Sequence, residues 1–116
     1  MQNTELTALP AGKSVYGIRA EKNSYDGALS YAAYRFDPDD AESPSGRRYT
    51  YTMTMKRWKT LEIALMRYSI MGIVCFPIFG QRPDCIYESE IFRLVDAGFD
   101  EMLGKRERTA VEAGNR

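Results

Sequence analysis

Residues 48–55 alternate strictly between two kinds of side chain. Tyr and Met occupy the odd positions from Tyr49 to Met55, and Thr occupies the even positions from Thr50 to Thr54. A repeat of two residues places these two sets on opposite sides of an extended chain, and aromatic and Thr side chains suit β-strands. The segment therefore predicts a strand with one apolar face, which restricts the domain to folds that contain a sheet.

Two more strands are predicted before this one, over residues 14–21 and 28–36. Asp26 followed by Gly27 is a strong signal for the turn of a hairpin between them. The alanines of the second segment also permit a short helix. Residues 37–46 contain two prolines, a glycine and four acids, and this composition predicts a loop.

The period of the apolar residues changes near residue 58. Trp58, Leu61, Leu65 and Tyr68 recur at the spacing of a helix, and Gly72 can end that helix because glycine tolerates a left-handed conformation. The apolar arc of this segment is wide. We therefore expect a helix that is well buried.

The last part of the chain predicts a strand and a second helix. Residues 73–79 are short, apolar and rich in β-branched and aromatic side chains, as in an inner strand. Pro77 lacks an amide donor and so belongs at an edge, a bulge or a strand end. An apolar stripe with helical period predicts a helix over 85–103 or 87–103, with Gly104 as its cap.

The order of these elements is strand, strand, strand, helix, strand, helix. We expect one α+β domain over residues 13–104, in which two helices pack on one face of a small antiparallel sheet of about four strands. A chain of 116 residues has the size of a single domain. Residues 1–12 are predicted to form a flexible N-terminal arm, and residues 105–116 a flexible C-terminal tail.

Histidine is absent from the sequence, which removes Ser-His-Asp and Cys-His catalysis and any metal site that contains histidine. Two cysteines are too few for a four-cysteine zinc site or a disulfide scaffold. Cys75 lies in an apolar run and is predicted to be buried and reduced, while a bridge to Cys85 stays open. We expect no catalytic residue, no metal and no cofactor, and thus no enzyme.

The charges of the chain balance, with 16 Lys and Arg against 16 Asp and Glu. No overall electrostatic field therefore draws the protein to nucleic acid or to a membrane. The longest uncharged segment, residues 68–81, is shorter than the about 20 apolar residues of a spanning helix. Residues 1–12 lack the basic start and apolar stretch of a secretion signal. These features predict a cytoplasmic protein that does not contact membranes.

Two adjacent segments of opposite charge supply the candidate partner-binding residues. The acidic segment consists of Asp37, Asp39, Asp40 and Glu42. The basic segment consists of Arg47, Arg48, Tyr49, Tyr51, Lys56, Arg57, Trp58 and Lys59.

Each segment has more than one interpretation. Carboxylates on a flexible protrusion imitate the charge of a nucleic-acid backbone and could compete for a basic groove on another protein. A solvated turn explains them equally simply, and the spacing lacks the glycine and distal glutamate of a calcium loop. In the basic segment, cations on phosphates and rings under bases are typical of single-stranded nucleic-acid binding. Alternatively, its tyrosines pack in the core and its charges flank the strand.

The sequence contains eight tyrosines, which suit either a tyrosine-rich core or a protein interface. We expect a non-enzymatic protein-binding module, a monomer or homodimer, that acts by occlusion. In type it is similar to phage- or mobile-element-encoded inhibitors of host nucleoprotein or enzyme complexes, anti-CRISPR proteins among them, although no residue pattern matches a named family. The alternatives are an RNA- or single-stranded-DNA-binding module that uses residues 47–59, and a histidine-free ribonuclease or toxin-like enzyme.

Overall fold

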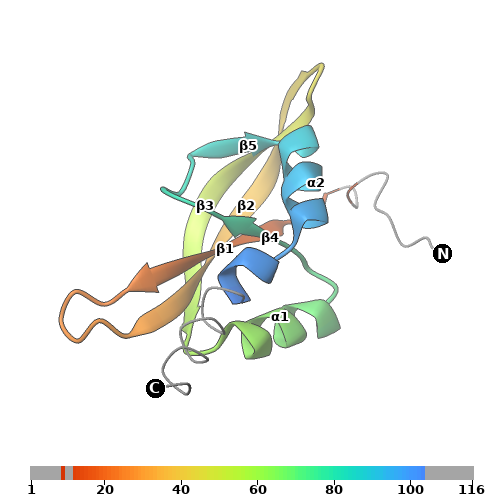
Figure 1. Ribbon diagram of the computed structural model, residues 1–116. Helices are drawn as coiled ribbons and strands as arrows, with labels where there is room; N and C mark the ends of the chain where they lie inside the picture. Colours follow the sequence, from red (N-terminus) through yellow and green to blue (C-terminus); the bar gives the residue numbers. More distant parts are fainter. Residues whose placement is uncertain (1–8, 10–11, 104–116) are drawn as a thin grey trace.

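A computed structural model of the chain describes residue 9 and residues 12–103, which form a five-stranded sheet and two helices (Figure 1). The elements are β1 (Val15–Lys22), β2 (Leu29–Ser43), β3 (Gly46–Trp58), α1 (Leu61–Ile70), β4 (Val74–Ile78), β5 (Cys85–Tyr87) and α2 (Glu88–Ala97). The strand order is β4-β1-β2-β3-β5, with β4 parallel to β1 and the other pairs antiparallel. The α+β class is confirmed, whereas the sheet of four antiparallel strands is wrong, because β5 was missed and β4 runs parallel.

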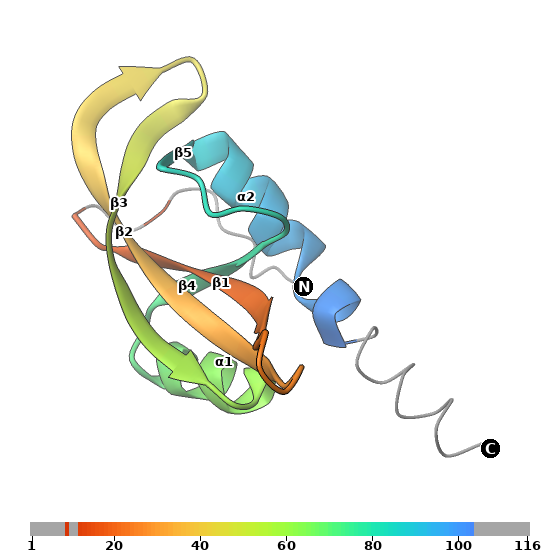
Figure 2. The same cartoon turned by 90° about the vertical axis from the view of Figure 1, so that its left-hand side faces the viewer.

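The first three strands form a meander. The predicted turn at Asp26 and Gly27 is confirmed, and it is closed by the bond from the Asn23 amide to the Ala28 carbonyl, at 2.8 Å. The predicted loop over 37–46 is wrong. β2 continues to Ser43 and pairs with β3, which begins at Gly46, so that only residues 44 and 45 form the turn of a long curved hairpin, which Figure 2 shows at the upper left.

Register shifts in the pairing of β2 with β3 interrupt the alternation of β3. Tyr51 lies opposite Phe36 in the core. Thr54 turns to the same face, where its hydroxyl lies 2.6 Å from the hydroxyl of Tyr51. Met53 and Met55 are 48% and 38% exposed. The predicted apolar face of this strand is therefore confirmed for its tyrosines and wrong for its methionines.

The two helices cover opposite faces of the sheet. Ala32 of β2 belongs to a core cluster that contains Ile91 of α2, whereas its neighbour Tyr31 belongs to a second cluster that contains Leu61 of α1. Successive side chains of a strand point to opposite faces. The expectation that both helices pack on one face is therefore wrong.

Both helices are shorter than the sequence predicts. α1 begins at Leu61, since Trp58, which the sequence places in the helix, is instead the last residue of β3. Gly72 follows the end of α1 with a φ of +76°, as expected. α2 ends at Ala97, because Gly98 adopts a φ of +75° and interrupts the predicted helix six residues before the expected cap. The chain then turns so that Met102 packs in the cluster on the α1 side.

Strand β4 forms one edge of the sheet, so the prediction of an inner strand is wrong and that of an edge position for Pro77 is confirmed. Pro77 has no backbone N–H to donate to a further strand, which limits pairing at this edge. The predicted arm and tail lie largely outside the described residues. Within the arm, Leu9 is buried in the cluster on the α2 side.

None of the helices in the described part of the chain is long and apolar enough to cross a membrane.

Candidate functional site

The basic segment is distributed along β3 and is not gathered at one place. Arg48 lies near the start of the strand and Lys56 near its end, about 27 Å apart at the usual rise per residue of a strand. Arg57 pairs with Ala32 of β2, whose side chain belongs to the cluster on the α2 side, so Arg57 lies on that face. Arg48 precedes Tyr49, whose side chain enters the same cluster. Arg48 and Arg57 therefore point to opposite faces of the sheet.

The aromatic rings of the basic segment are already engaged within the protein. Tyr49 is fully buried. The indole nitrogen of Trp58 donates a hydrogen bond to the hydroxyl of Tyr68 at 2.8 Å, and the ammonium of Lys56 lies 4.3 Å from the centre of the indole ring. The ring of Tyr51 is covered by Arg82, whose guanidinium carbon lies 3.6 Å from the ring centre. The structure thus does not assemble a stacking platform from this segment.

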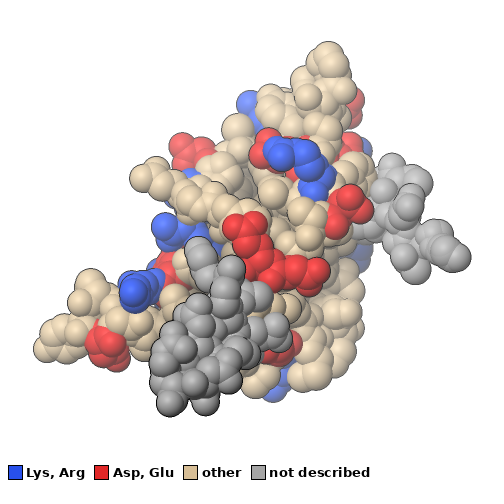
Figure 3. Space-filling model, in the orientation of Figure 1, with Lys and Arg blue, Asp and Glu red and all other residues tan. Residues whose placement is uncertain are grey.

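The remaining cations of the basic segment lie near the ends of β3, where Arg47 is half-buried and Lys59 is exposed. Figure 3 shows that cationic and anionic side chains are intermixed on the visible face of the molecule. No continuous basic surface appears in that view.

The acidic segment belongs to the hairpin of β2 and β3 and is not a free protrusion. Asp37 accepts hydrogen bonds from the Ser14 hydroxyl and from the Arg35 guanidinium, the latter at 2.8 Å. Asp39 is bound by Arg48 of β3, at 2.9 Å. The other two members of the segment, Asp40 and Glu42, are exposed. Two of the four acids are therefore held by partners within the domain, and Asp39 links the two strands of the hairpin.

The surroundings of Asp39 make the stability of the folded protein sensitive to acid. The Thr50 hydroxyl, the Ala41 amide and the Arg48 guanidinium lower the pKa of Asp39 to about 2. Since an unfolded aspartate has a pKa of about 3.9, the carboxylate stabilises the folded state above about pH 4, and this contribution is lost as the pH falls toward 2. Asp39→Asn should therefore lower the urea midpoint clearly at pH 6 and much less at pH 2, where about half of the carboxyl groups are protonated.

The control for this prediction is Asp40→Asn, which changes an exposed neighbour and should leave the urea midpoint unaltered across the same pH range. An equal difference between wild type and Asp39→Asn at pH 2 and pH 6 would show that the carboxylate charge is not what stabilises the hairpin.

The tyrosines of the chain serve mainly the core. Five of them are buried, at positions Tyr16, Tyr31, Tyr34, Tyr49 and Tyr68. Tyr25, in the turn between β1 and β2, is the tyrosine that is almost fully exposed, at 98%. Of the two interpretations of the tyrosine content, the structure favours the tyrosine-rich core.

The exposed apolar surface lies instead on α1. Ile63, Met66 and Ile70 follow each other by three and four residues, which places them on one side of a helix. These side chains are 45%, 53% and 77% exposed, and Met71 after the helix is 65% exposed. The opposite side of α1 carries its buried residues. We call Ile63, Met66, Ile70 and Met71 the α1 outer face.

This surface was missed at the level of sequence, although a signal for it was present. The apolar arc of the segment is too wide for one buried stripe, and its width alone predicts a deeply buried helix. Because the sheet lies on only one side of α1, the second half of the arc faces solvent. A contiguous exposed apolar surface commonly marks an interaction site.

A second group missed by the sequence analysis is a cluster of polar side chains on the α2 side of the sheet. Glu21 of β1 accepts hydrogen bonds from Arg19, at 3.0 Å, from Arg57, at 3.2 Å, and from the hydroxyl of Tyr34. These bonds lower the pKa of the Glu21 carboxyl, although burial acts against them. We call these four residues, together with Arg82, the Glu21 cluster. The members come from three strands and a loop, and no sequence spacing links them.

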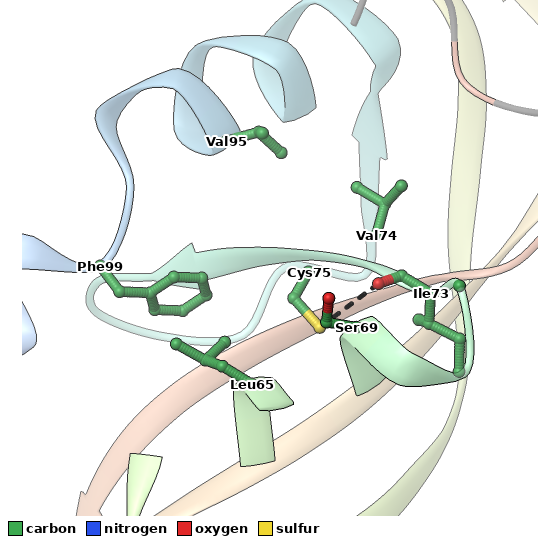
Figure 4. Close-up of a pocket in the computed structure, with 8 residues that line it drawn as sticks. Leu65, Ser69, Ile73, Val74, Cys75, Val95 and Phe99 are labelled. Atoms are coloured by element: carbon green, nitrogen blue, oxygen red, sulfur yellow. Dashed lines mark hydrogen bonds between the residues drawn. The ribbon is translucent and has the colours of Figure 1, made fainter. Parts of the chain in front are cut away.

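A pocket of about 400 Å³ lies where α1, α2 and the edge strand β4 meet (Figure 4). Its walls are mostly apolar and include Leu65 of α1, Val95 of α2 and Phe99, which follows α2. The Cys75 thiol donates a long hydrogen bond, 3.9 Å, to the carbonyl of Ile73. Burial raises the pKa of Cys75 to about 12, which keeps the thiol protonated at neutral pH. The pocket thus offers apolar contact without an activated nucleophile.

Within the described residues, no three potential metal ligands gather at one place. Cys75 and Cys85 are both free thiols, so the bridge that the sequence left open is not formed.

Comparison with protein-family models, with curated proteins and with solved structures finds no match for this chain.

Proposed function

We propose that the chain is a non-enzymatic protein-binding module and that the α1 outer face is its contact surface. The observation that carries this proposal is the exposure of four large apolar side chains on α1 and the turn after it, out of nine in the described part of the chain. Covering such a surface with a partner removes apolar area from water, which is the main driving force of association.

The composition of the face also suits a protein partner. Met66 and Met71 carry flexible, polarisable side chains that adapt to the shape of a partner. Glu62 and Arg67 are exposed charges on the same helix, at the rim of the apolar stripe. The partner expected here has an apolar groove with an acidic side chain at its border that can pair with Arg67. An inhibitor that acts by occlusion, such as a mobile-element-encoded protein, needs a surface of this kind and no catalytic group.

A double variant, Met66→Glu and Ile70→Glu, tests this proposal. We expect affinity capture from the native host with the full chain to recover a stoichiometric protein partner. The affinity of the double variant for this partner should be at least tenfold lower, because two charges would be buried in the contact. Mass spectrometry identifies the partner, and binding is then measured with both purified components.

The control is Leu29→Glu, which places one such charge at a 46% exposed apolar position on β2 and should bind normally. The variants are compared by circular dichroism, and exposed substitutions should leave the fold intact. Loss of the partner after nuclease treatment would overturn the proposal in favour of nucleic-acid binding. It would also be overturned if the wild-type chain formed a dimer that the double variant dissociated, because the face would then serve a second copy.

A further inference from the structure

The Glu21 cluster brings three guanidinium groups to one place on the α2 side of the sheet. Arg19 and Arg57 contact the two oxygens of the Glu21 carboxylate, at 3.0 and 3.2 Å. The guanidinium carbon of Arg82 lies 5.8 Å from the ring centre of Tyr34, whose hydroxyl is bound to the same carboxylate. The three cations therefore surround one carboxylate–phenol pair.

The charges of this cluster do not balance. Glu21 is the acid enclosed by the cluster, with 19% of its side chain exposed. Asp84 lies 3.5 Å from Arg82, but its side chain is 97% exposed, so water and salt weaken this pair. Three cations thus share one firmly held carboxylate, and the cluster has an excess of positive charge.

The guanidinium groups are also held in fixed orientations. Arg82 stacks on the ring of Tyr51 and donates one hydrogen bond to the carbonyl of Pro83, at 3.0 Å. The Nε of Arg19 donates to the carbonyl of Gly80. Groups that are ordered before a ligand arrives lose little further conformational entropy on binding.

Donors are still available on these arginines. The hydrogen bond of Arg57 to Glu21 uses Nε, the side chain is 57% exposed, and its two terminal nitrogens have no acceptor among the hydrogen bonds of the described residues. Arg82 uses Nη1 toward the protein, at Pro83 and Asp84. Among the hydrogen bonds of the described residues, the second terminal nitrogen of Arg82 has no acceptor. Paired N–H groups of this kind match the oxygens of a phosphate.

We propose that the Glu21 cluster binds a phosphate group, carried either by inorganic phosphate or by a small phosphomonoester. A phosphate that carries about 1.5 to 2 negative charges at neutral pH offsets the excess of positive charge in the cluster. Arg82 covers one face of the Tyr51 ring and so competes with a nucleobase for stacking there. The cluster therefore recognises the phosphate itself. This inference is independent of the α1 outer face, which lies on the other side of the sheet.

Isothermal titration with inorganic phosphate, at constant ionic strength, tests the proposal. We expect saturable binding to the wild-type chain, weakened about tenfold or more by Arg57→Gln and by Arg82→Gln. Glu21→Gln should act in the opposite direction and tighten binding, because it removes the carboxylate that competes for the same guanidinium groups. A simple loss of structure would not produce effects of opposite sign.

The matched control is Arg93→Gln, an exposed arginine of α2 that pairs with Glu90 and should bind phosphate like the wild type. A second titration with glycerol phosphate separates the two sources, because tighter binding of the ester indicates a phosphomonoester ligand and equal or weaker binding indicates free phosphate. The proposal is overturned if phosphate produces no saturable heat, if Arg93→Gln weakens binding as much as Arg57→Gln, or if Glu21→Gln also weakens it.

Discussion

Replacing Phe36 with Ala is expected to lower the free energy of unfolding by about 3–5 kcal/mol, the usual cost of deleting a buried ring. Phe36 is fully buried, and its ring centre lies 5.6 Å from that of Phe76 and 6.0 Å from that of Tyr51. The substitution leaves a cavity between β2, β3 and β4. Such a loss is a large share of the 5–15 kcal/mol that typically stabilises a domain. Urea unfolding followed by tryptophan fluorescence measures it.

The control for this experiment is Leu29→Ala, at a 46% exposed position of β2, which should cost well under the value for Phe36. A loss below about 1 kcal/mol for Phe36→Ala would mean that the α2-side cluster is not packed as described.

The second large effect concerns the reactivity of the two thiols. Burial raises the pKa of Cys75 from 9.0 to about 12, whereas Cys85 is exposed. The thiolate is the reactive form, so a shift of this size reduces its population at pH 8 by about a thousandfold. The folded protein should therefore show one rapidly reacting thiol in an assay with a chromogenic disulfide reagent. After unfolding in urea it should show two.

Cys85→Ser provides the control and should abolish the rapid reaction without changing the slow one. Two rapid thiols in the folded protein would contradict the burial of Cys75. No reactive thiol even after unfolding would indicate that the two cysteines are bridged.

The sequence predicted the elements whose signals are local. The turn at Asp26 and Gly27 depends on the backbone of a few residues, and the end of α1 at Gly72 depends on one residue that accepts a positive φ. The apolar runs likewise predicted β1, most of β3 and both helices, because side-chain periodicity is a property of each segment alone. From these signals the α+β class follows, but the arrangement of the layers does not.

The errors concern features that arise from pairing between distant segments. Residues 37–46 have the composition of a loop, yet Asp39 is satisfied by Arg48 and Thr50 across the hairpin, which removes the cost of placing an acid in a strand. Bulges in the same pairing redirect Met53 to solvent. Neither effect is visible until the register of the two strands is known.

The candidate sites were predicted least well, for the same reason. The acidic and basic segments are prominent in the sequence, but cross-strand pairs neutralise several of their charges in the structure, as between Arg48 and Asp39. The Glu21 cluster combines a strand acid with an arginine from the loop before β5, Arg82, and only the fold brings them together. The α1 outer face required knowledge of which side of the helix meets the sheet.

The parallel pairing of β4 with β1 determines the order in which the sheet can be completed. The meander of β1, β2 and β3 joins neighbours in sequence, so it can form on the ribosome as soon as those residues emerge. β1 occupies an interior position and lacks its second neighbour until β4 has been synthesised and α1 has crossed the sheet. During that interval the growing chain exposes an unpaired strand edge, and a chaperone that shields such edges would act at this stage of synthesis.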